Sequence, residues 1–139
     1  PPLQEVAVGR AVRSAAHEDI NLITILVGAT NSGLELLDRD GKWLAVETTP
    51  DSLVVDSGDM LSRLTNDIIP STTHRVVNPD NSTSARYSMP FFVHPHAKAE
   101  LRCLESCRGA GEKYAPISSH EFLMQRIKDI GLLERPLIS

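Results

Sequence analysis

Short apolar segments separated by turn-forming residues make up most of the chain. They are rich in Val, Ile, Leu and aromatic residues and are too short for typical helices, so the pattern predicts strands. These segments are LITILVG (22–28), LELL (34–37), WLAVET (43–48), SLVVD (52–56), THRVVN (73–78) and RYSMPFFVH (86–94). Many short strands with regular turn signals indicate a β-sandwich or barrel.

The sequence also predicts one hairpin turn and two helical segments. Asp40 and Gly41, between the second and third apolar segments, are expected to supply the positive backbone dihedrals of a tight turn. SSHEFLMQRIKDIG (118–131) has apolar residues at helical spacing, a serine that can cap its start and a glycine that can end it. We expect this helix to pack on the outside of the barrel, and we expect one or two helical turns within 58–67.

Composition limits the classes of partner. The chain has 139 residues, which fits one domain, and no stretch of about 18 uncharged apolar residues that could span a membrane. Its formal net charge of -4 offers no basic stripe for nucleic acid. Cys103 and Cys107 cannot build a disulfide framework, and no signal-peptide pattern is present, so we expect free thiols and a cytoplasmic protein.

His17 and Asp19 precede the apolar segment 22–28. If a strand begins at His17, the two side chains point to the same face and can share a ligand. A solvated strand end or a hydrogen-bonded pair is the simpler interpretation of this motif taken alone. A zinc-protease helix is excluded, because Asn21 occupies the position of its second histidine.

His74 stands before another apolar strand, much as His17 does. Two histidines and one carboxylate leave three positions of an octahedral ion open, which is the arrangement in non-heme Fe(II) oxygenases that bind a cosubstrate and O₂. A structural zinc ion would instead take four protein ligands. Taken alone, His74 is better interpreted as a hydrogen-bonded strand histidine, and only the two motifs together favour a metal site.

Arg86 and Ser88 are spaced as neighbours on one face of a strand. A guanidinium beside a hydroxyl is a receptor for a carboxylate, and arginine offers a bidentate fork that lysine lacks. We expect their strand to lie next to that of His74, or nearly so. The alternative for Arg86 alone is an exposed arginine at a sheet edge.

Four blocks together resemble the iron and 2-oxoglutarate-dependent dioxygenases of the isopenicillin N synthase-like family. They are HEDINLITILVG, GDMLSRLTND, STTHRVVNP and ARYSMPFFVHP, and they occur in the family's order. The resemblance implies a double-stranded β-helix, which is a cupin-like jelly roll, with a C-terminal α-helix. It also implies that His17, Asp19 and His74 are catalytic ligands of Fe(II), and that Arg86 and Ser88 hold the distal carboxylate of 2-oxoglutarate.

The family resemblance further implies a reaction. Such an enzyme oxidises, typically by hydroxylation, a small organic substrate with O₂ and converts 2-oxoglutarate to succinate and CO₂. The family normally has a long N-terminal region, so we expect residues 1–139 to form one catalytic domain without it. Two alternatives stay open: an oxidase that works without 2-oxoglutarate, and a metal-binding or ligand-binding jelly roll without catalysis. The Arg86 and Ser88 pair favours the oxygenase, because a mere metal-binding module has no need of a carboxylate clamp.

Overall fold

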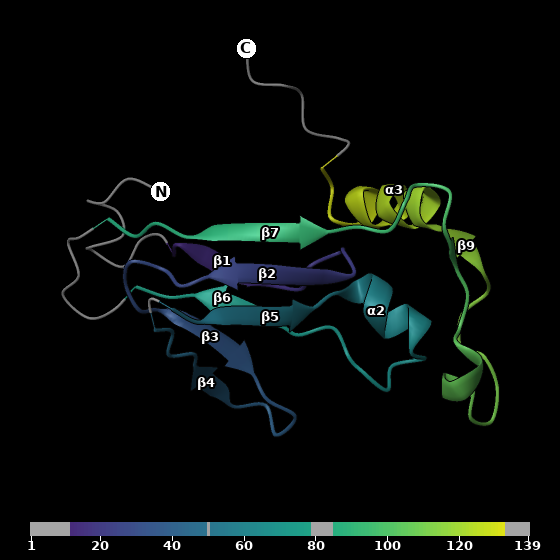
Figure 1. Ribbon diagram of the computed structural model, residues 1–139, viewed down its shortest axis with the longest axis horizontal. Helices are drawn as coiled ribbons and strands as arrows, with labels where there is room; N and C mark the ends of the chain where they lie inside the picture. Colours follow the sequence, from purple (N-terminus) through teal and green to yellow (C-terminus); the bar gives the residue numbers. More distant parts are fainter. Residues whose placement is uncertain (1–11, 50, 79–84, 133–139) are drawn as a thin grey trace, which may run out of the picture.

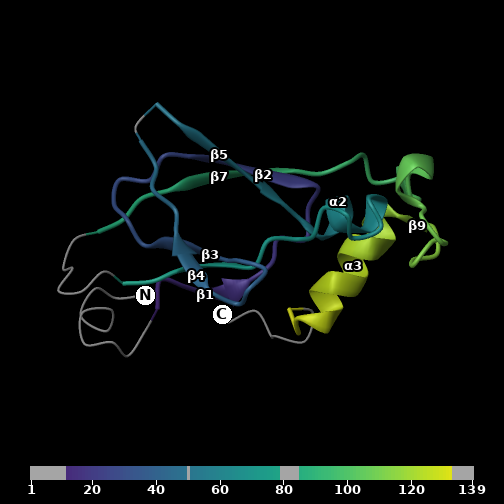
Figure 2. The same cartoon turned by 90° about the horizontal axis from the view of Figure 1, so that it is seen from below.

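A computed structural model describes residues 12–49, 51–78 and 85–132. In this part of the chain two antiparallel sheets face each other, as Figures 1 and 2 show from two directions. The first sheet contains, in spatial order, β1 (Ser14–His17), β6 (His74–Val76), β3 (Leu34–Leu37) and β4 (Trp43–Ala45). The second contains β5 (Leu53–Ser57), β2 (Ile23–Val27) and β7 (Met89–Val93). The predicted mainly β architecture is therefore confirmed.

The second sheet positions side chains through the two-residue period of its strands. In the register of the sheet, Thr24 on β2 lies opposite Asp56 on β5 and opposite Phe92 on β7. One row of inward side chains therefore crosses the whole sheet, because residues opposite each other share a face. A second row, two residues along, consists of Val54, Leu26 and Pro90. Both rows face the space between the sheets.

The hairpin between β3 and β4 forms where the sequence predicts it, with Leu37 opposite Trp43. The prediction of two positive dihedrals was wrong, because only Gly41 adopts one, with φ of +76°. The carboxylate of Asp38 accepts hydrogen bonds from the backbone N–H groups of Asp40 and Lys42. This side chain stabilises a longer loop, which needs a left-handed residue only at Gly41.

Both predicted helical segments are confirmed, and they lie at one end of the sandwich (Figure 2). The C-terminal helix α3 (Ser119–Asp129) begins with a capping box, in which Ser118 and Glu121 satisfy each other's backbone N–H groups. Buried Met60 and Leu101 pack with Phe122 of α3 to form the core at this end. The remaining elements here are α2 (Asp59–Leu64), β8 (Glu100–Leu101), β9 (Ile117–Ser118) and the 3₁₀ turn η1 (Glu105–Cys107).

The cysteines and the helices agree with two further expectations from the sequence. Cys103 and Cys107 are free thiols, as predicted. Among the described residues, no helix has the length and apolar character needed to cross a membrane.

The start of α2 is bonded directly to the backbone that links β1 to β2. The N–H of Asp59 donates to the carbonyl of Asp19 at 2.8 Å, and the N–H of Met60 donates to that of Asn21 at 3.1 Å. Gly58 permits this approach, because a β-carbon there would lie 2.2 Å from the carbonyl oxygen of Asn21 and 2.8 Å from that of Asp19. Those contacts are far below van der Waals distance, so the position requires glycine.

Replacing Gly58 should therefore destabilise the protein strongly. We expect Gly58→Ala to lower the free energy of unfolding by about 3 kcal/mol, the upper end of the range for overpacking, because two backbone segments must separate. Gly41→Ala is the matched control. A β-carbon there has nothing within 4 Å, so it should lose only about 1 to 2 kcal/mol from its positive φ. Urea unfolding measures both, and equal losses would contradict the steric argument.

Candidate metal centre

His17 and His74 are brought together by strand pairing. His17 is the last residue of β1 and His74 is the first of β6, and the two are directly opposite in the ladder. Their ring centroids are 4.3 Å apart. The condition that a strand begins at His17 is not met, because a short strand, β1, ends there and the apolar strand starts at Ile23. The sequence SAAH has small side chains and lacks the apolar alternation that reveals a strand.

A β-bulge turns His17 toward its partner. Ser14 pairs with Val76 and His17 with His74, so three steps along β1 face two steps along β6. In a regular strand, side chains three residues apart point to opposite faces of the sheet. The extra residue of the bulge lets the side chains of Ser14 and His17 point to the same face. Both side chains consequently line the space between the sheets.

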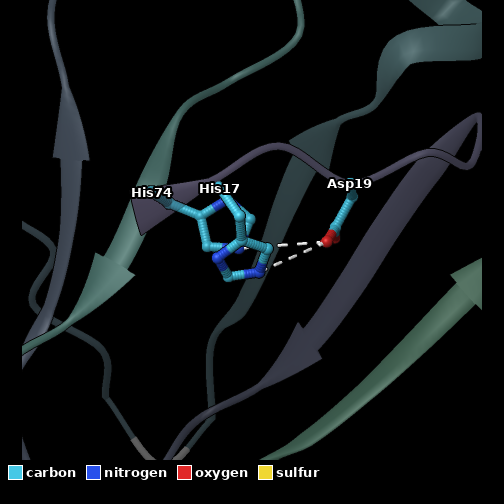
Figure 3. Close-up of side chains that lie close together, drawn as sticks. All are labelled: His17, Asp19 and His74. Atoms are coloured by element: carbon cyan, nitrogen blue, oxygen red, sulfur yellow. Dashed lines mark ion pairs between the residues drawn. The ribbon is translucent and has the colours of Figure 1, made fainter. Parts of the chain in front are cut away.

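Asp19 follows β1 in the connection to β2, and a buried hydrogen-bond chain sets its orientation. The Thr24 hydroxyl donates to Oδ2 of Asp19, and Nδ2 of Asn21 donates to that hydroxyl oxygen at 2.8 Å. The other carboxylate oxygen, Oδ1, lies 3.8 Å from Nε2 of His17 and 4.0 Å from Nε2 of His74. Figure 3 shows the two imidazoles and the carboxylate converging from β1, β6 and the connecting segment.

Backbone carbonyls select the tautomer of both histidines. Nδ1 of His17 is 2.7 Å from the carbonyl oxygen of Ala15, and Nδ1 of His74 is 3.0 Å from that of Thr72. A carbonyl can only accept, so each Nδ1 carries the proton and each Nε2 offers its lone pair. The ligand atoms of His17, Asp19 and His74 all lie within 4.8 Å of one another. This donor set fits a divalent metal ion with open coordination positions.

Asp56 also belongs to this region, and the sequence reasoning missed it. Its Oδ2 lies 3.2 Å from Nδ1 of His74, and both side chains are 17% exposed. Burial raises the pKa of Asp56 above its ordinary value, although a hydrogen bond from Thr72 and the proximity of His74 oppose this. The sequence pattern places Asp56 at the end of the strand segment 52–56 and gives it no role in a site. Its inward position follows from the two-residue period that it shares with Val54.

Arg86 and Ser88 are adjacent, although they precede β7. Nη1 of Arg86 donates to the Ser88 hydroxyl at 3.0 Å, and Nε donates to the carbonyl of Asn31 at 3.0 Å. Among the described residues, no carboxylate pairs with this guanidinium. Burial lowers the pKa of Arg86, and the neighbouring charge of Arg13 lowers it further.

The expected neighbouring position of the His74 and Arg86 strands was wrong. β6 lies in the first sheet, between β1 and β3, whereas β7 pairs with β2 in the second. The segments that carry His74 and Arg86 therefore approach the interior from opposite layers. Sequence proximity could not distinguish strands of two sheets from the two strands of a hairpin.

One cavity of about 320 Å³ connects the two groups of residues. His17, Asp19, His74, Arg86 and Ser88 all line it, and Asp56 and Thr24 contribute further polar atoms. Its remaining wall is mostly apolar and includes Leu26, Leu36, Val54, Val76 and Phe92. The structure therefore brings all five sequence-predicted residues to the lining of one cavity.

Comparisons with solved structures support the same architecture. A crystal structure of a Caulobacter crescentus protein assigned to the 2OG-Fe(II) oxygenase family is 46% identical, with a TM-score of 0.78. It matches 85% of this chain and 40% of that one. A full-length Neurospora crassa protein in complex with alpha-KG and thymine is 31% identical, with a TM-score of 0.79, over 86% of this chain and 38% of that one. The predicted jelly-roll fold is thereby confirmed.

Sequence comparisons identify the family. A 2-oxoglutarate-dependent dioxygenase of Monascus ruber is 35% identical over 126 residues, which is 90% of this chain and 38% of that protein. Gibberellin 2-beta-dioxygenase 7 of Arabidopsis thaliana is 35% identical over 82% of this chain and 32% of its own length. The chain thus spans less than two fifths of these relatives. The sequence pattern of the 2OG-Fe(II) oxygenase superfamily matches residues 3–95, so the chain belongs to that superfamily.

Proposed function

We propose that this protein is an Fe(II)- and 2-oxoglutarate-dependent dioxygenase that oxidises a small organic molecule. The observation that carries the proposal is the shared cavity, in which His17, Asp19 and His74 converge while Arg86 and Ser88 line the same space. Membership of the superfamily supports the same chemistry. When bound, Fe(II) supplies the redox chemistry that couples decarboxylation of 2-oxoglutarate to succinate with oxidation of the substrate by O₂.

His17, Asp19 and His74 are the proposed metal ligands. The protein contributes preorganisation, because hydrogen bonds to Ala15, Thr72 and Thr24 already orient the three side chains. The protein offers three ligands, so an octahedral ion held by them would keep three positions for the cosubstrate and O₂. Few side-chain rotations would then be lost on metal binding.

Arg86 and Ser88 are the proposed clamp for the distal carboxylate of 2-oxoglutarate. The Ser88 and Asn31 contacts fix the guanidinium, which still has N–H groups to offer a carboxylate. A carboxylate ligand would also neutralise a partly buried cation that no described acidic side chain pairs with. The clamp therefore sets the depth to which the cosubstrate enters the cavity.

A second hollow beside the metal ligands supports a small-molecule substrate. It measures about 820 Å³ and lies where His17 and Asp19 face α3. Apolar residues of α3, namely Leu123 and Ile127, line it together with Phe92. A substrate held there would lie next to the ligands but outside the cosubstrate cavity. We expect neither nucleic acid nor a membrane to be a partner of this protein. A cytoplasmic location also stays a prediction.

The metal-ligand assignment predicts the effect of single substitutions. The protein should bind one Fe(II) or Co(II) per chain, and His74→Ala should weaken binding at least about 100-fold, because loss of even an outer partner costs about 10- to 100-fold. Anaerobic isothermal titration calorimetry measures this. His120→Gln is the matched control, because His120 is an exposed residue of α3 and should leave affinity unchanged. Equal affinity of the His74→Ala and wild-type proteins would contradict the assignment.

The cosubstrate assignment predicts a defect in 2-oxoglutarate use. With Fe(II), O₂ and 2-oxoglutarate, the protein should form succinate, and Arg86→Ala should raise the KM for 2-oxoglutarate at least tenfold. Charge-assisted hydrogen bonds contribute about 1.5 to 3 kcal/mol each, which corresponds to this factor or more. Arg86→Lys should be intermediate, because it keeps the charge but loses the fork.

Arg102→Ala is the matched control for this experiment, because Arg102 forms an exposed ion pair with Glu100 in the β8 region. Its KM should equal that of the wild-type protein. Oxidation of a substrate without any succinate, by a protein that binds Fe(II), would replace our proposal with a 2-oxoglutarate-independent oxidase. An unchanged KM in Arg86→Ala would remove Arg86 from the clamp.

A further inference from the structure

Asp56 is a carboxylate inside the cavity that the proposed reaction does not use. It lies on β5 directly opposite Thr24 of β2, so both side chains enter the cavity from one row of the second sheet. Thr24 reaches Asp19, and Asp56 reaches His74. Two neighbouring residues of one sheet thereby contact two ligands of the candidate metal centre.

Asp56 contacts Nδ1 of His74, which is the ring nitrogen that points away from the proposed metal position. Its Oδ2 lies 3.2 Å from Nδ1 of His74, while Nε2 of the same ring is directed toward Asp19. The Thr72 carbonyl, 3.0 Å from Nδ1, accepts a hydrogen bond from that nitrogen. The carboxylate adds a negative charge beside the same N–H group, in a place where both side chains are only 17% exposed.

His17 provides an internal comparison. Its Nδ1 has the Ala15 carbonyl at 2.7 Å as acceptor, and its side chain is 44% exposed. No carboxylate is described beside its Nδ1. The two histidines of the site therefore differ in one respect that matters chemically, because only His74 has an anion next to its protonated nitrogen.

We propose that Asp56 is a positioning residue for His74, and that its charge holds the Nδ1–H form and strengthens Nε2 as a donor to a divalent cation. A negative charge beside an imidazole N–H draws the proton toward itself and leaves more electron density on the opposite nitrogen. This inference rests on the proposed function, since it assigns His74 as a ligand. It makes His74 the stronger of the two imidazole donors.

Asp56→Asn tests the proposal, because it keeps the shape of the side chain and removes the charge. The first measurement is the ¹H–¹⁵N spectrum of the histidine rings in the metal-free protein. The Nδ1–H signal of His74 should move upfield, while the His17 signals should stay in place. The second is Co(II) affinity, which should fall about tenfold, the lower end of the range for outer partners of a metal ligand.

Two further variants make the result specific. Glu35→Gln removes a carboxylate from β3 that pairs with Arg75, the residue after His74, and should change neither the His74 signal nor the affinity. Asp56→Ala withdraws the acceptor altogether and should weaken Co(II) binding at least as much as Asp56→Asn. It also serves if the amide variant does not fold.

The outcomes separate this inference from the proposed function. An unchanged His74 signal with Co(II) affinity within twofold of wild type would show that the Thr72 carbonyl alone orients the ring, and would overturn the role of Asp56. Failure of the wild-type protein to bind Co(II) through His17 and His74 would overturn the proposed function and this inference with it. A shifted signal together with a tenfold loss of affinity would support both.

Discussion

The approach of two backbone segments at Gly58 is the constraint on which the site depends. The first turn of α2 donates two hydrogen bonds to the segment that carries Asp19, and that segment leaves no room for a β-carbon. Met60, the next residue but one, is completely buried in the core between α2, β8 and α3. Packing at this end of the sandwich therefore fixes where the Asp19 carboxylate lies in the interior.

The two sheets contribute different parts of the same chemistry. The first sheet supplies both histidines as a cross-strand pair, and the second supplies Thr24 and Asp56, which contact Asp19 and His74. Arg86 and Ser88 then reach the cavity just ahead of β7. The proposed metal ligands, the side chains that contact them and the arginine come from both layers, so the site requires the sheets to face each other at a fixed distance.

Local patterns in the sequence predicted the strands and helices better than the contacts between them. The segments 22–28 and 34–37 show clear apolar patterns, and the box of Ser118 and Glu121 marks the start of α3. By contrast, β1 was missed, because SAAH has no such pattern and its bulge is a property of pairing with β6. Asp56 was missed for a related reason, since its partner, His74, lies on a strand of the other sheet.

The cross-strand position of His17 and His74 couples metal occupancy to the mechanical integrity of the fold. Among the described strands, β1 lies at the edge of the first sheet and pairs only with β6, through a ladder that a bulge interrupts. An ion bound to both rings would act as a cross-link between these two strands, and because it binds only the folded state it would add its binding free energy to their pairing. Strand β1 would then separate from β6 least often when the metal centre holds an ion.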